Sequence, residues 1–513
     1  MVDFSRRDFL KHGSKGLALL SVPFVFKNSF ANVLNFPADK KTDPTGYFEK
    51  FGVDQSMINQ VMSAALAKGG DYCDVYFQHT IANYVGLEDK LVNRAFTDVA
   101  LGVGIRVIKG DQTGYSFSED ISLKSMIGAA KTAAVVANSS KKVSPIEFKL
   151  HKTPNYYPIK TSWQDVKIDQ RIPFLQTIND NVFKQDSRIK KVTIWFADEE
   201  SFVLTATSDG TYCTDHRPMT LLYVSCIAEQ NGRREDNGYN FSARDGIEFY
   251  TPERIEVLAN ESVRRTVSLF DAVKPEAGEM PVVLAAGSSG ILLHEAIGHG
   301  MEADFNRKGT SIFSDKINKP VAKDIVSIVD DGTNKNIRGS LNIDDEGNDV
   351  EKTYLVKDGI LKTYLHDRIS AKHYNVNPTG NGRRQSFRHS PMPRMRNTYM
   401  LPGPHKKEEI IKSVNKGIYA ETFTNGQVFI GAGDFTFYVK TGYLIEDGKL
   451  TKPIKDINII GNGPKVLENV VMVADDFKMA EGGWTCGKNG QSVPVSMGLP
   501  TVKVSSITVG GVS

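Results

Sequence analysis

The sequence has little of what marks several specialised protein classes. Four cysteines in 513 residues are too few for a disulfide framework in so long a chain. Acidic and basic residues nearly balance, and the net charge of +3 is too mild to indicate nucleic acid as the main partner. No internal stretch approaches the about 18 consecutive apolar residues of a membrane-spanning helix. These shortages argue against a disulfide-rich small domain, a nucleic-acid-binding protein and a membrane span in the mature chain.

The remaining composition, 40% hydrophobic and 24% charged, is that of an ordinary globular protein. The length predicts two or more domains. In the first half of the chain, some segments have the apolar spacing of helices and others the alternation of strands. From about Val192 the alternation predicts an antiparallel sheet with one wet, solvent-facing side. The second half is strand-like and glycine-rich, with one notable helix. We therefore predict an α+β fold, with an N-terminal domain over 45–275, divisible into 45–140 and 150–275, and a β-rich C-terminal domain over 276–513.

The N-terminus has the pattern of an export signal. Arg6 and Arg7 stand in "SRRDFLK", a modest apolar run follows, and small residues near Ala31 suit cleavage after that position. This order resembles a bacterial twin-arginine signal, which predicts a periplasmic protein. The alternative is a basic amphipathic start to the first helix. Residues 1–31 are therefore set apart from the predicted fold.

The stretch "GILLHEAIGHGMEAD" carries the strongest chemical pattern. His294 and His299 flank a glutamate, Glu295, as in the H-E-x-x-H helix of zinc peptidases, but they are five positions apart. On a regular helix five residues turn the second side chain about 140° from the first. Two local features could repair this geometry. The glycines at 298 and 300 could end the helix in a left-handed conformation, or a widened turn could bring the two imidazoles together.

Two histidines do not make a zinc site by themselves, and both could be hydrogen-bonded core residues. A third ligand is needed. Cys486, in "GGWTCGKNGQSVPV", is the candidate because it lies between glycine-rich turns in a polar, lysine-containing loop that favours thiolate. Spacing alone cannot bring Cys486 to His299, since 187 positions separate them.

Several long motifs, in order along the chain, resemble the TldD/PmbA family, some of whose members are called modulators of DNA gyrase. The resemblance runs from about Cys73 to the C-terminus and is strongest after Pro281. Its motifs are "HEAIGHGMEAD", "SLNIDDEG", "GNGRRQSFRHSPMPRMRNTYM", "GDFTFYV" and "GGWTCGKNGQSVPVSMGLPTVKV". The chain is similar to the catalytic TldD branch, whose members are zinc metallopeptidases, rather than to the PmbA (TldE) branch, which lacks the histidine motif.

The resemblance implies specific roles and partners. By position, His294, His299 and Cys486 resemble the zinc ligands, and Glu295 resembles the catalytic glutamate. It further implies a homodimer or a heterodimer with a PmbA-like paralogue, an enclosed site, and a peptide or unfolded polypeptide as substrate. The alternative function is a non-catalytic regulatory or binding subunit that keeps zinc structurally. Glu295 favours the enzyme, because a purely structural site needs no general base and has four protein ligands.

Two further features have competing interpretations. Cys213 and Cys226 lie on two strand-like runs and could form a disulfide, although nothing in the sequence requires it and buried free thiols are the simpler interpretation. The segment from Arg383 to Arg396 is rich in arginine. It could bind a nucleic acid or a substrate carboxylate, but we expect it to pair with carboxylates of the protein, as at Asp344, Asp345 and Glu346. In the same segment, His389 could support the site, although a lone histidine is more often structural.

Overall fold

The computed structural model describes residues 44–137 and 143–511. The predicted export signal, residues 1–31, lies outside the described residues. None of the described helices is long and apolar enough to span a membrane.

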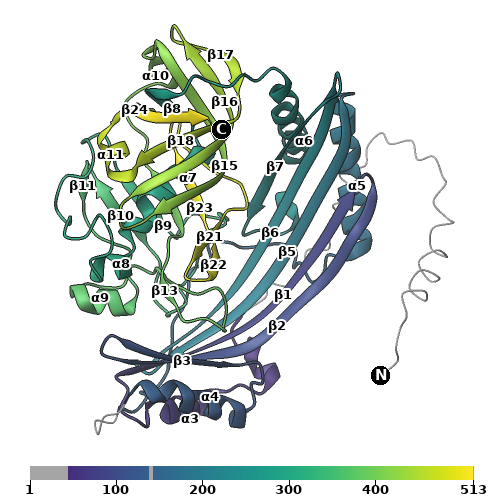
Figure 1. The fold of residues 1–513 in the computed structure, drawn as a ribbon. Coiled ribbons are helices and arrows are strands. Elements are labelled where there is room, and N and C mark those ends of the chain that lie inside the picture. Colours follow the sequence, from purple (N-terminus) through teal and green to yellow (C-terminus); the bar gives the residue numbers. More distant parts are fainter. Residues whose placement is uncertain (1–43, 138–142, 512–513) are drawn as a thin grey trace, which may run out of the picture. The chain divides into compact units, whose positions relative to one another are not determined.

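A long antiparallel sheet dominates the first half of the described chain (Figure 1). Its strand order is β3-β2-β1-β5-β6-β4, with β7 also paired to β6, and the short β4 is its parallel strand. The strands are β1 (Tyr72–Glu88), β2 (Leu91–Lys109), β3 (Gln112–Ser118), β4 (Lys149–Leu150), β5 (Ile189–Thr207), β6 (Thr211–Gln230) and β7 (Arg233–Ala243).

Helices pack on this sheet in two pairs. The pair α3 (Gln55–Leu66) and α4 (Leu123–Ala133) contacts β1 to β3, and the pair α5 (Ile168–Gln185) and α6 (Pro252–Val267) contacts β5 to β7. Helix α6 has a favourable start: the Thr251 side chain accepts a hydrogen bond from the backbone N–H of Arg254, and proline occupies the first turn.

The predicted wet face of the sheet is only partly present. Along the first half of β5, buried and half-buried residues alternate as expected, but the second half, from about Glu200, is buried at every position. There the sheet carries buried charges, among them Asp215 and Arg217, which bond to residues of the second half of the chain. The alternation therefore predicts the part of the sheet that meets solvent and fails where both faces are covered.

The possible Cys213–Cys226 disulfide is excluded by the fold. The predicted two runs are one continuous strand, β6, and 13 residues of extended chain separate the two sulfurs by roughly 40 Å. Both cysteines are free and buried. The strand continues through Pro218 because β7 pairs with β6 only from Thr220 onward, so the proline lies where β6 has a free edge.

The second half of the described chain contains a sheet closed into a barrel. Its order is β15-β8-β24-β18-β16-β17, and an added β15–β16 pairing closes the ring. The strands are β8 (Gly278–Leu284), β15 (Lys416–Phe429), β16 (Asp434–Glu446), β17 (Lys449–Ile454), β18 (Ile457–Asn462), β24 (Val502–Gly511) and β19 (Val470–Val473), the last paired to β24.

A six-stranded sheet lies in the same half, in the order β11-β10-β9-β14-β23-β20. Its strands are β9 (Ile328–Asp331), β10 (Lys352–Lys357), β11 (Ile360–Leu361), β14 (Asn397–Met400), β20 (Lys478–Met479) and β23 (Ser496–Leu499). Two small hairpins pair β12 (Gly382–Arg383) with β13 (Met392–Pro393) and β21 (Thr485–Lys488) with β22 (Gln491–Pro494). The short helices are α7 (Ile291–Leu293), α8 (Ala303–Arg307), α9 (Arg368–Tyr374), α10 (Lys407–Lys412) and α11 (Gly463–Glu468).

The predicted histidine helix packs between these sheets. The turn that follows α7 contacts β15 and β16 of the barrel and β14 of the six-stranded sheet. Ile291, Leu292, Ile297 and Met301 from this segment join the apolar core shared by both sheets. The α+β prediction is thus confirmed, and the histidines lie on a short helical segment among buried apolar neighbours.

Candidate metal centre

A widened helical turn solves the spacing of the two histidines. Residues His294–Gly298 form one π-helical turn, in which the backbone N–H of His299 donates to the carbonyl of His294. This i→i+5 bond places residues five apart on the same side of the helix. The two imidazole ring centroids are 5.2 Å apart. The prediction of a widened turn is confirmed.

The glycines beside His299 do not end the helix in a left-handed conformation. Gly298 keeps a right-handed helical conformation, with φ −59°. A Cβ on Gly298 would lie 2.1 Å from the sulfur of Met395, and one on Gly300 would lie 2.7 Å from the ring of Phe313. These glycines therefore permit close packing around the turn, and the left-handed explanation is wrong.

Cys486 meets both histidines although it comes from β21. Its Sγ lies 3.2 Å from Nε2 of His299, and one ligand atom from each of Cys486, His294 and His299 falls within 4.8 Å of the others. All three residues are at most 4% exposed. The structure thus brings together the three residues that were predicted from the sequence as metal ligands.

The chemistry of this cluster fits a cation. Both ring nitrogens of His294 are buried, and neither makes a hydrogen bond of ordinary geometry among the described residues. Burying them in this way is costly, and a cation bound at one of them would offset part of that cost. Burial alone would raise the pKa of the Cys486 thiol, but His294 and His299 outweigh burial and hold that pKa well below its ordinary value. Two imidazoles and one thiolate are a donor set that zinc prefers, and three protein ligands leave a fourth position free, as in catalytic sites.

Glu295 lies beside the cluster and remains accessible. Its side chain is 27% exposed, and Oε2 lies 3.7 Å from Nε2 of His299. Within the described residues its carboxylate accepts no hydrogen bond that would occupy it. The neighbouring acid in the same motif, Glu302, is fully buried and is bonded to protein groups. Glu295 is therefore the carboxylate of this motif that can exchange a proton with a small molecule at the centre.

Two residues of the centre escaped the sequence interpretation. Glu302 accepts a hydrogen bond from Nδ1 of His299 at 2.9 Å, and Lys488 donates to the same carboxylate oxygen at 3.0 Å. Burial would raise the pKa of Glu302, but Lys488 and His299 lower it to about 2. The available signal was an acid three residues after His299, a spacing at which side chains on a helix are neighbours, although Glu302 itself has an extended backbone.

The arginine segment is structural. Arg383, Arg384, Arg394 and Arg396 are all at most 4% exposed, so they cannot form a surface for nucleic-acid phosphates. As expected, arginines of this segment pair with carboxylates, but mostly not with the three acids predicted. Arg384 pairs with Asp74 and Arg396 with Asp330, whereas the exposed Arg388 pairs with Glu119. In the same segment, His389 bonds to Ser386 across 3.0 Å.

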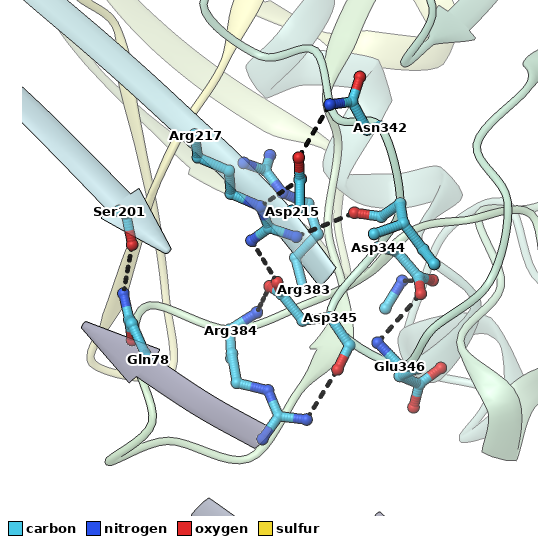
Figure 2. A network of polar contacts seen from close by, with 12 residues as sticks. Gln78, Ser201, Asp215, Arg217, Asn342, Asp344, Asp345, Glu346, Arg383 and Arg384 are labelled. Atoms are coloured by element: carbon cyan, nitrogen blue, oxygen red, sulfur yellow. Dashed lines mark hydrogen bonds and ion pairs between the residues drawn. The ribbon is translucent and has the colours of Figure 1, made fainter. Parts of the chain in front are cut away.

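The predicted acids hold the segment against the long sheet (Figure 2). Asp345 accepts from Arg217 of β6 at 2.6 Å and from the backbone N–H of Arg384 at 2.8 Å. Glu346 pairs with Arg106 of β2 at 2.7 Å. Asp344 instead accepts backbone bonds from its own turn, including one from Glu346. This buried network joins the long sheet to the segments around Asp345 and Arg384 in the second half of the described chain.

Two surface grooves lie away from the centre. One, of about 640 Å³, is lined by residues around Pro154 and by β6, and another, of about 670 Å³, lies around Phe435 and Ile460. Neither is lined by His294, Glu295, His299 or Cys486. The two grooves lack a comparable set of metal donors, so we place the chemistry at the buried cluster.

An α+β chain in which a buried His–His–Cys cluster adjoins an accessible glutamate has the organisation of a metallopeptidase. Comparison with known proteins agrees. The PmbA/TldA metallopeptidase C-terminal domain matches residues 277–511, its central domain matches 161–270, and its domain 1 matches 73–137. The chain belongs to the PmbA/TldD metallopeptidase family.

Relatives extend over most of the chain. It is 40% identical to the metalloprotease TldD homologue of Haemophilus influenzae, over 86% of this chain and 93% of that protein. It is 28% identical to a zinc metalloprotease TldD homologue of Saccharolobus solfataricus, over 86% of this chain and 97% of that protein.

Two solved structures share the fold. A protein from Thermotoga maritima described as a modulator of a DNA gyrase has a TM-score of 0.71 at 20% identity, covering 89% of this chain and 100% of that one. TldE from Thermococcus kodakarensis has a TM-score of 0.69 at 18% identity, with the same coverage. At these identities the likeness concerns the fold alone.

Proposed function

We propose that the protein is a zinc-dependent peptidase that hydrolyses peptides or unfolded protein segments. His294, His299 and Cys486 hold the zinc, and Glu295 is the general base. The observation that carries this proposal is the buried convergence of three ligand atoms within 4.8 Å, with His294 otherwise unpartnered and Glu295 beside them. The name of the Saccharolobus relative, a zinc metalloprotease, supports the choice of ion.

The residues divide the work of hydrolysis between them. Zinc, when bound, polarises the peptide carbonyl and lowers the pKa of a water molecule to about 7. Glu295 accepts the proton of the attacking water and returns it to the leaving amine, as a carboxylate with access to both can do. Glu302 accepts a hydrogen bond from Nδ1 of His299, which would leave the Nε2 lone pair of that ring to hold the ion.

Hydrolysis of an unfolded substrate by the purified protein tests this proposal. We expect the purified protein to cleave a permanently unfolded protein. A zinc chelator should abolish this cleavage, and added zinc should restore it. Zinc-bound protein that cleaves no unfolded substrate, alone or with a PmbA-like partner, would favour the alternative of a non-catalytic subunit.

We further propose that the protein works as a dimer. Strand β3 pairs with β2 only from Val103 onward, so the part of β2 from Leu91 has a free edge in the described structure. That part is exposed at every residue to Val99 and carries apolar side chains, with Leu91 73% and Phe96 53% exposed. Exposed apolar edge strands are surfaces that pair with another chain.

Light scattering measures the assembly. We expect a mass near twice the 56.7 kDa of one chain, less any segment removed on export. Replacing Phe96 and Val99 by lysine should leave monomers, whereas lysine at the exposed Val257 on α6 should not change the mass. A monomer both alone and with a PmbA-like paralogue would contradict the dimer, and dimers of the lysine variant would place the interface elsewhere.

We also propose export to the periplasm through the twin-arginine pathway. The motif "SRRDFLK" fused to a folded reporter should deliver it across the inner membrane, and Arg6→Lys with Arg7→Lys should abolish delivery. Equal periplasmic delivery by the double variant would remove this proposal without touching the chemistry.

A further inference from the structure

The hairpin that carries Cys486 has no sheet to support it. Strands β21 and β22 pair only with each other among the described residues. A two-stranded hairpin alone is at best marginally stable in water. The sulfur of Cys486 can therefore sit 3.2 Å from His299 only if side-chain contacts dock the hairpin.

Lys488 supplies such a contact. It lies two residues after Cys486 on β21, so both side chains leave the same face of the strand. Its ammonium group is buried and donates to Oδ1 of Asp304 at 2.7 Å and to Oε2 of Glu302 at 3.0 Å. It also lies 4.2 Å from the ring centre of Phe305. The cation of the cysteine hairpin is thus inserted into the segment that follows His299.

Glu302 links this cation to a zinc ligand. Its side chain is fully buried, and one oxygen, Oε2, receives both Nζ of Lys488 and Nδ1 of His299. A single carboxylate oxygen therefore fixes the orientation of one proposed ligand and the position of the strand that bears another. Since 187 residues separate His299 from Cys486, this bridge is a direct tie between the two elements.

We propose that Lys488 and Glu302 are positioning residues that assemble the metal centre by docking the cysteine hairpin onto the histidine turn. This inference rests on the proposed zinc site. Carboxylates that orient a ligating histidine typically contribute 10- to 100-fold, as an order of magnitude, to metal affinity. Arg394 also ties the hairpin, by donating to the backbone carbonyls of Cys486 and Gln491. Lys488 is the cation that bonds directly to Glu302, so we expect its loss to have an effect of the same size.

Zinc affinity measured by chelator competition tests the bridge directly. Lys488→Met keeps the length of the side chain and removes the charge, and Glu302→Gln keeps the shape of the carboxylate. We expect each to weaken zinc binding by about 10- to 100-fold. The double variant should bind zinc as tightly as the weaker-binding single variant, because both substitutions break the same Lys488–Glu302 bridge. In cobalt-substituted protein, the thiolate-to-metal absorption band of Cys486 should weaken in parallel.

A matched control separates positioning from general stability. Arg171 forms a buried ion pair with Asp198 on the long sheet, so Arg171→Met should lower the melting temperature and leave zinc affinity unchanged. Wild-type affinity in folded Lys488→Met, or losses that multiply in the double variant, would overturn the inference. If Lys488→Met does not fold, the double variant Lys488→Met with Glu302→Gln, which lacks both charges of the bridge, provides the test. Unchanged zinc affinity in that variant would also overturn the inference. Wild-type protein that binds no zinc would instead sink the proposed function.

Discussion

Glu295→Gln is expected to keep its zinc and to lose peptide hydrolysis by at least about 100-fold, the lower range for general-base catalysis. Glutamine preserves the volume and the backbone of the π-helical turn but cannot accept a proton. Glu295 is not among the proposed zinc ligands, so the metal should remain bound. Turnover of an unfolded substrate and zinc content, measured on the same sample, check both halves of the expectation.

The control for this variant is Glu256→Gln, an exposed glutamate on α6, which should hydrolyse like the wild type. Full activity of Glu295→Gln would show that the base is misassigned. Loss of zinc from Glu295→Gln would show that this carboxylate holds the ion or the turn rather than a proton.

Cys486→Ser is expected to lose zinc and activity together. A hydroxyl is a much poorer zinc ligand than a thiolate, and the site has two other proposed protein ligands, His294 and His299. Alanine at either histidine should have the same effect. Elemental analysis of the purified variant and its turnover of unfolded substrate give the two readouts. The separation of this phenotype from that of Glu295→Gln is what distinguishes a ligand from a base.

Cys226→Ser provides the matched control for the cysteine variant. Cys226 is also buried, and its sulfur contacts the hydroxyl of Thr266 at 3.1 Å, which a serine can replace. This variant should retain zinc and activity. Stoichiometric zinc and normal cleavage in Cys486→Ser would mean that the third ligand is another residue.

The local geometry of the histidine turn could be predicted from sequence because its cause is local. Five-residue spacing admits few backbone conformations that bring both imidazoles together, and the widened turn was one of them. The role of the glycines was not predictable in the same way. Gly298 is required by Met395, a residue almost a hundred positions further along the chain, and only the folded structure places that sulfur against the turn.

The third ligand could not be derived from spacing, since nothing in the sequence measures the distance between β21 and the turn. Motif resemblance supplied Cys486. It did not supply Lys488 or Glu302, because a lysine in a polar loop and an acid after a helix are ordinary solvated residues until the fold buries them. Their pairing depends on how the hairpin docks, which is a tertiary property.

The long sheet shows a similar boundary between local and tertiary information. Cys213 and Cys226 were predicted to lie on two separate runs, yet the single strand β6 carries both and continues through Pro218 because one edge of the strand is free there. Helix α5 was not predicted, because its sequence is polar on average and contains Pro173. Its apolar residues, such as Phe174 and Ile178, stabilise the helix by packing against β5. In both cases strand or helix packing overrides the local preference.

X-ray absorption at the zinc edge of the wild-type protein tests the central claim most directly. Our account predicts one zinc ion per chain. The sulfur of Cys486 should lie about 2.3 Å from the zinc, and the imidazole nitrogens of His294 and His299 about 2.0 to 2.1 Å from it. The sulfur shell should be absent in any zinc retained by Cys486→Ser. A wild-type spectrum without sulfur, or protein that binds no zinc, would contradict the assignment of this cluster as the metal centre.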